Sequence, residues 1–122
     1  MVECDPSPSA REAARLRDIV EAAAAGRWDR FEELSDVPFP NTSSMREQFL
    51  ESAPVLSKMG ERRTLRTLAR LSDDGTRYLF CTVVPEDVSI PSVTLTVLSS
   101  TEGDGGTFET IVFVPELDLS AL

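Results

Sequence analysis

The sequence predicts an α+β fold in which N-terminal helices pack on a bent antiparallel sheet of about four strands, in a cone-like arrangement. The first observation is a change of hydrophobic period near Gly60. Before it, apolar residues recur every three or four positions, and from Tyr78 onward they alternate with period two. The second observation is that turn signals separate the alternating segments. Helices followed by a run of strands are typical of one small α+β domain.

Length and composition fit a single domain with a packed core. The chain has 122 residues, of which 41% are hydrophobic and 27% are charged. We expect residues 1–8 to form a flexible arm, residues 9–114 a single α+β domain and residues 115–122 a C-terminal tail. No apolar stretch is long enough for a membrane helix, and no signal-peptide pattern is present, so we expect a cytoplasmic protein without membrane contact.

The first two helices have clear local signals. Ser9 and Glu12 form a capping box, in which each side chain satisfies a backbone N–H of the first turn, so a helix is predicted to begin there. Gly26 is placed to end it in the left-handed conformation. A second, short helix is predicted over residues 28–34. We interpret Trp28 as a core anchor, with a ligand-stacking platform as the alternative.

A third helix is predicted to lead up to Gly60. Ser44 and Glu47 repeat the capping-box pattern at its start. Pro54 interrupts its apolar stripe, because proline removes a helical hydrogen bond and clashes with the preceding turn. We therefore expect either a kink or two short helices that meet near Ser52.

The segment over residues 61–72 fits two structures. Leu65, Leu68 and Ala69 have helical spacing, whereas every second residue of the same segment is apolar or small, as in a strand. The Asp-Asp-Gly that follows at residues 73–75 is a strong hairpin signal. We therefore predict a strand.

Three further strands are predicted over residues 77–84, 91–99 and 107–114, which are rich in aromatic and β-branched residues. The glycine-rich residues 102–106 predict a hairpin between the last two. Both faces of the strand at 77–84 are apolar, and one layer of helices can cover only one face. The other face must meet a cavity, the C-terminal tail or another chain.

The element order resembles a known superfamily. Two N-terminal helices are joined through A-A-A-A-G-R-W-D at residues 22–29, and a third helix and four meandering strands with Asp-Asp-Gly in the first hairpin follow. Over residues 9–114 this is similar to the nuclear-transport-factor-two-like superfamily of cystatin-like cones. The resemblance implies a strongly bent sheet that wraps against the helices around a cone-shaped cavity. Members use that cavity for catalysis, binding or dimerisation, so no single function follows.

The net charge of −9 is unevenly distributed. Residues 61–77 carry five arginines and three acids, whereas residues 78–122 carry seven acids and no base. Without a large basic face, neither nucleic acid nor an anionic membrane is an expected partner. A basic protein partner is compatible with the acidic third of the chain.

The residue inventory limits the possible chemistry. The chain has no histidine and two cysteines, which cannot complete a four-ligand zinc site, so we predict no metal and no cofactor. Cys81 lies in an apolar strand pattern and is interpreted as a core thiol. If a pocket exists, Tyr78 and Glu109 are the candidate catalytic residues, because Glu109 would have a raised pKa if it faced inward.

Three arginines with a spacing of four are the other ligand-binding candidates besides Trp28. Arg62, Arg66 and Arg70 share one side of the segment whether it is a helix or a strand. Such a row can clamp a carboxylate or a phosphate. It can equally pair with acids of the C-terminal third at the surface.

These observations lead to a main hypothesis and two alternatives. We expect a non-enzymatic accessory or interaction domain that forms a homodimer through the open face of its sheet. The first alternative is a cone-shaped pocket that binds a small molecule or performs cofactor-free acid–base chemistry. The second is an acidic inhibitor of a basic protein.

Overall fold

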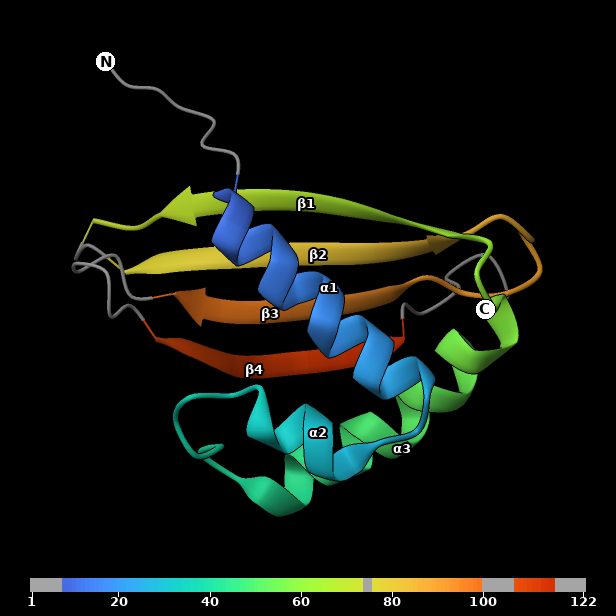
Figure 1. Ribbon diagram of the computed structural model, residues 1–122, viewed down its shortest axis with the longest axis horizontal. Coiled ribbons are helices and arrows are strands. Elements are labelled where there is room, and N and C mark those ends of the chain that lie inside the picture. Colours follow the sequence, from blue (N-terminus) through green and yellow to red (C-terminus); the bar gives the residue numbers. More distant parts are fainter. Residues whose placement is uncertain (1–7, 74–75, 100–106, 116–122) are drawn as a thin grey trace.

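Three helices precede a four-stranded antiparallel sheet in this computed structural model, which describes residues 8–73, 76–99 and 107–115 (Figure 1). The helices are α1 (Ala10–Ala24), α2 (Trp28–Glu33) and α3 (Thr42–Met59). The strands are β1 (Arg63–Leu71), β2 (Arg77–Pro85), β3 (Val93–Ser99) and β4 (Phe108–Pro115). Consecutive strands are neighbours, in the order β1-β2-β3-β4. The predicted α+β fold with N-terminal helices packed on the sheet is confirmed.

The helices lie on one side of the sheet. Figure 1 shows α1 crossing one face from β1 toward α3, while α2 and α3 lie along β4. Within the described part of the chain, no helix is both long and apolar enough to cross a membrane.

The first helix begins and ends where its local sequence predicts. The Ser9 side chain accepts a hydrogen bond from the Glu12 N–H at 3.1 Å, and Glu12 accepts one from the Ser9 N–H at 2.8 Å. Gly26 follows the helix with a φ of 73°, in the left-handed region that favours glycine. Both signals are local, which explains why the sequence alone reveals them.

The third helix differs from its prediction at two points. Its N-cap is Asn41, which accepts a hydrogen bond from the Ser44 N–H at 3.0 Å, so the predicted capping box at Ser44 is wrong. The helix also runs as one segment through Pro54, so the two short helices do not occur. Because proline has no backbone N–H, Pro54 cannot donate a hydrogen bond to the Leu50 carbonyl. Both residues are exposed, and water can replace the missing bond.

The ambiguous segment over residues 61–72 contains a strand, as predicted. All nine residues of β1 pair with β2, from Arg63 with Pro85 to Leu71 with Arg77. Pro115 belongs to β4, so the predicted tail begins one residue too early. The remaining predictions for the N-terminal arm, the turn at 73–75, the hairpin at 102–106 and the tail lie wholly or partly outside the described residues.

The core lies between the helices and the inward face of the sheet. Leu79, Cys81 and Val83 alternate along β2 and are fully buried. Burial raises the pKa of Cys81 to about 12, so it is an inert core thiol, as interpreted. A cluster of aromatic rings with neighbouring centroids 5.0 to 6.0 Å apart joins α2, α3 and β4. Its members are Trp28, Phe31, Phe39, Phe49 and Phe113.

Two ion pairs hold α1 over the sheet. Near its start, the Glu12 carboxylate accepts hydrogen bonds from Arg77 Nε and Nη2, both at 2.8 Å, and from Ser99 Oγ at 2.8 Å. Toward its end, Glu21 pairs with Arg63 of β1 at 2.8 Å. The first pair is largely buried, with 9% of the Glu12 side chain exposed.

Glu12 is charged in spite of its burial. Burial raises its pKa, but the hydrogen bonds from Arg77, the Ser9 backbone and Ser99, together with the charge of Arg77, outweigh this effect. The net result is a pKa lowered from 4.5 to about 2. Glu12 therefore joins the first turn of α1 to the start of β2 and the end of β3.

We predict that Glu12→Gln lowers the free energy of unfolding by about 3 kcal/mol at pH 7, because it removes the carboxylate that pairs with the Arg77 guanidinium in a largely buried site. The folded-state pKa lies below the unfolded value, so this stabilisation is present above pH 4.5 and is lost as the pH falls toward about 2. Urea unfolding of both proteins across this pH range should show their difference shrinking.

The matched control is Glu33→Gln, which removes an exposed pair with Arg30 at 3.1 Å. It should cost less than about 1 kcal/mol at any pH. Equal losses for the two variants would contradict the role assigned to Glu12.

Candidate functional site

The face of the sheet that points away from the helices is the largest candidate surface, and we call it the open face. Its side chains alternate with the core residues along all four strands. Leu68 is 44% exposed and Val112 is 37% exposed. The apolar members are Leu68, Tyr78, Phe80, Val84, Leu98, Val112 and Val114, the hydroxyl members are Thr64, Thr82, Thr94 and Thr96, and the charged members are Arg66, Arg70 and Glu109.

The strand register arranges the centre of the open face in a row of three apolar residues and one threonine, which we call the apolar row. Leu68 pairs with Phe80, Phe80 with Thr96, and Thr96 with Val112. The rings of Tyr78 and Phe80 stack with their centroids 6.3 Å apart. Thr96 is only 8% exposed on this face, because it lies between larger side chains. The centre of the open face is therefore mainly apolar and closely packed.

Tyr78 and Glu109 both lie on the open face. Tyr78 pairs with Leu98, and Leu98 pairs with Glu109, so the two residues are two strands apart. At the usual strand spacing this is roughly 10 Å, too far for a direct hydrogen bond. Glu109 points outward, since its neighbours Phe108 and Thr110 are buried toward the helices. The structure does not bring the predicted catalytic pair together.

The three candidate arginines occupy two environments. Arg66 and Arg70 lie on the open face of β1 and are exposed. Arg62 precedes β1 and pairs with Glu86 at 3.4 Å, with both side chains largely exposed. Within residues 8–73, 76–99 and 107–115, no ion pair involves Arg66 or Arg70. These two cations are therefore available to a ligand or to another chain.

Trp28 lies on the opposite side of the sheet from these arginines. Its ring contacts Phe31, Phe39 and Phe49, and the Arg46 guanidinium carbon lies 5.3 Å from its centroid. Phe39 is buried, so the loop before α3 contributes to the core. Trp28 closes the aromatic cluster and does not share a site with the arginines.

The outer edge of β4 is capped by side chains from the helical half of the chain. The Phe108 N–H donates to Asp36 Oδ2 at 3.0 Å, and its carbonyl accepts from the Asp36 N–H at 2.7 Å. Farther along, the Phe113 N–H donates to Gln48 Oε1 at 2.7 Å, and its carbonyl accepts from Ser52 Oγ at 2.9 Å. These bonds occupy backbone groups that another strand would need.

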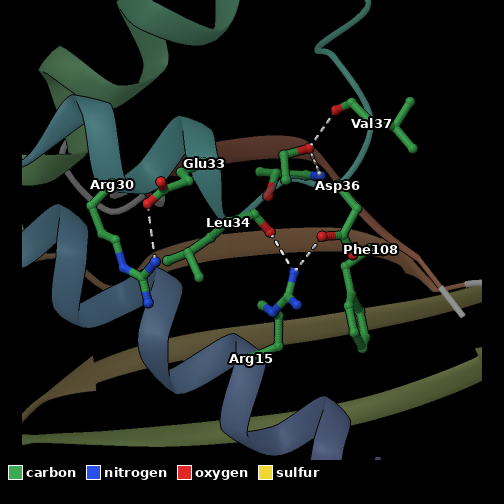
Figure 2. A network of polar contacts seen from close by, with 9 residues as sticks. Arg15, Arg30, Glu33, Leu34, Asp36, Val37 and Phe108 are labelled. Atoms are coloured by element: carbon green, nitrogen blue, oxygen red, sulfur yellow. Dashed lines mark hydrogen bonds and ion pairs between the residues drawn. The ribbon is translucent and has the colours of Figure 1, made fainter. Parts of the chain in front are cut away.

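Asp36 is itself held in place by α1. Figure 2 shows Arg15 reaching from α1 to the Leu34 carbonyl and to Asp36 Oδ1, at 2.7 and 3.2 Å. The Arg15 guanidinium also lies 4.6 Å from the centroid of the Phe108 ring. The cap of the β4 edge is thus part of the helix–sheet packing.

Sequence reasoning missed this cap because its partners lie far apart along the chain. Gln48 and Ser52 are separated from Phe113 by more than sixty positions. The one sequence signal is their polar character on an otherwise apolar side of α3.

A groove of about 620 Å³ lies between α1 and β1. Its lining is mixed, with apolar, hydroxyl, acidic and basic side chains: Ala13, Arg17, Glu21, Glu61, Arg63, Leu65 and Thr67. Among the described residues, no group of three or more histidine, cysteine, aspartate or glutamate side chains is arranged to hold a metal ion.

Comparisons of the chain with protein-family models, with curated proteins and with solved structures find no match. The resemblance to the nuclear-transport-factor-two-like superfamily stays a prediction. Functional inference therefore depends on the geometry of the open face, the sheet edges and the α1–β1 groove.

We predict that Ser52→Ala lowers the free energy of unfolding by about 1–3 kcal/mol, because it leaves the Phe113 carbonyl without its side-chain donor in a buried site. Ser57→Ala on the same helix is the matched control, since Ser57 is exposed, and it should change stability by less than about 0.5 kcal/mol. Thermal or urea unfolding measures both; an equal effect would show that the cap contributes nothing.

Proposed function

We propose that this chain is a non-enzymatic protein-association domain that forms a homodimer through the open face of its sheet. The observation that carries the proposal is the placement of the described helices on one side of the sheet (Figure 1), which leaves Leu68 and Val112 exposed and Phe80 half-buried on the other face. A contiguous apolar surface of this kind is typical of a protein interface.

The size of the open face indicates a weak dimer. Four strands of about eight residues cover roughly 500 Å² in projection, from the usual strand spacing and rise. Stable interfaces bury about 800 Å² on each partner. We therefore expect a dissociation constant in the micromolar range, which matches a domain that associates reversibly.

Charge on the open face favours one arrangement of the two copies. Arg66 and Arg70 lie on β1, and Glu109 lies on β4 at the opposite edge. A twofold axis parallel to the strands places β1 of one copy over β4 of the other, so that opposite charges approach. An axis perpendicular to the strands places β1 over β1 and brings four arginines together, which is unfavourable.

The two alternative functions receive less support from the geometry. Acid–base chemistry would require Tyr78 and Glu109 to converge, and Leu98 lies between them in the strand register. An inhibitor of a basic protein would present acids, whereas the open face carries two arginines and one glutamate. We also propose a cytoplasmic location, since the buried free thiol of Cys81 needs no oxidising compartment.

We predict that Val112→Lys weakens self-association at least about tenfold, because it places a charge in the apolar row of the open face. The matched control is Leu50→Lys on α3, which is 61% exposed and lies outside the face; it should self-associate like the unchanged protein. Sedimentation velocity over a concentration series measures both. A strict monomer at concentrations up to about 1 mM would refute the homodimer.

The arrangement of the copies has its own test. Glu109→Lys alone should weaken the dimer, and Arg66→Glu with Arg70→Glu should weaken it too, because each change creates like charges across the interface. Combining all three substitutions should restore affinity if β1 lies over β4 of the second copy. Additive weakening in the triple variant would contradict this arrangement.

A further inference from the structure

The two edges of the sheet differ in how far their outward backbone groups are hydrogen-bonded. The β4 edge is capped at Phe108 and Phe113 by side chains of Asp36, Gln48 and Ser52. Within residues 8–73, 76–99 and 107–115, no such cap is found at the outer edge of β1.

The direction of the β1 backbone groups follows from the bonds at both ends of the β1–β2 ladder. Ser72 N–H donates to the Thr76 carbonyl at 2.8 Å, and Glu86 N–H donates to the Arg62 carbonyl at 3.0 Å. Both pairs continue the β1–β2 register, and bonded pairs alternate with non-bonded pairs in an antiparallel ladder. The even-numbered residues of β1 therefore bond to β2, and the odd-numbered ones direct N–H and C=O away from the sheet.

Leu65 and Thr67 are central odd-numbered residues of β1 and are half-buried and exposed, respectively, whereas the next one, Ala69, is buried. No hydrogen bond joins their outward backbone groups to any residue in the described part of the chain. A nine-residue edge strand with such groups is a template for pairing with a further strand.

The helix-side surface next to this edge is hollow. The α1–β1 groove, of about 620 Å³, runs beside Leu65 and Thr67, and Thr67 is exposed although it points to the helix side. The opposite wall comes from α1, through Ala13 and Arg17. Because α1 is tied to the sheet by its two ion pairs, the groove is a fixed feature beside the edge.

The arginines beside the outer edge of β1 favour an acidic strand at this edge over a basic one. Arg66 and Arg70 point from β1 to the open face, roughly 13 Å apart along the strand, without an ion pair to any described residue. A second copy of β1 at this edge would add two more arginines to the same rim, which is unfavourable. An extended segment with acids at alternating positions would instead place carboxylates beside both guanidinium groups.

We propose that the outer edge of β1 binds an extended acidic segment of a partner protein, which joins the sheet as a fifth strand. Its backbone bonds to the outward groups of Leu65 and Thr67. Side chains on one side of it enter the α1–β1 groove, and those on the other side meet Arg66 and Arg70. The backbone groups of this edge lie outside the open face, so the two proposals share only Arg66 and Arg70.

The test uses the full chain and a fluorescein-labelled nonapeptide that alternates glutamate with threonine and valine. Fluorescence anisotropy should show saturable binding that weakens with added salt. Thr67→Pro should weaken binding at least about tenfold, because it removes an outward N–H without breaking a bond to β2. Thr67→Val keeps the N–H and the strand propensity, and should bind like the unchanged protein.

Two control peptides separate backbone pairing from simple charge attraction. A version N-methylated at alternate residues, which cannot pair as a strand, should bind at least about tenfold more weakly, and so should a version with lysine in place of glutamate. No binding of the acidic peptide at about 1 mM protein, or equal binding of either control peptide, would overturn the proposal. So would unchanged binding to Thr67→Pro.

The outcome is independent of the homodimer. Val112→Lys lies on β4, at the far side of the open face from β1, and should leave peptide affinity within about twofold. Thr67→Pro should likewise keep the self-association measured by sedimentation. Loss of both activities in both variants would mean that the edge and the open face are one surface, which contradicts the separate site.

Discussion

An α+β domain with one layer of helices can bury only one face of its sheet, and this constraint governs the surface of the protein. The core residues of β2, Leu79, Cys81 and Val83, are fully buried under the helices. Tyr78 and Phe80 alternate with them and lie on the other side. The same strand therefore supplies both the core and the proposed interface, and a solvent-exposed face with so many apolar side chains calls for a partner.

The helices contact the two edges of the sheet in different ways. On the β4 side, Gln48 and Ser52 satisfy the backbone of Phe113 and close that edge. On the β1 side, Glu12 and Glu21 tie α1 to the strands at two points and leave a groove beside an unpaired edge. Among the described residues, the β1 edge is therefore the one at which we propose a further strand, and its arginines disfavour a strand of like charge.

Local signals predicted most of the fold, and long-range contacts account for what they missed. The period change and the Asp-Asp-Gly turn correctly indicated a strand at residues 61–72, and Ser9 with Glu12 marked the start of α1. The Ser44 pattern was misleading because Asn41, three residues earlier, provides an equally good cap. The spacing of Arg66 and Arg70 predicted a shared side, but only the register of four strands places them across the open face from Glu109.

The most direct test of the central claim is to record backbone amide NMR spectra of the unchanged protein at about 20 µM and about 1 mM, which bracket the expected dissociation constant. The account predicts concentration-dependent shifts concentrated in β1 to β4, strongest around the row from Leu68 to Val112, with little change in α2. Spectra that do not change with concentration, or shifts confined to the helices, would contradict it.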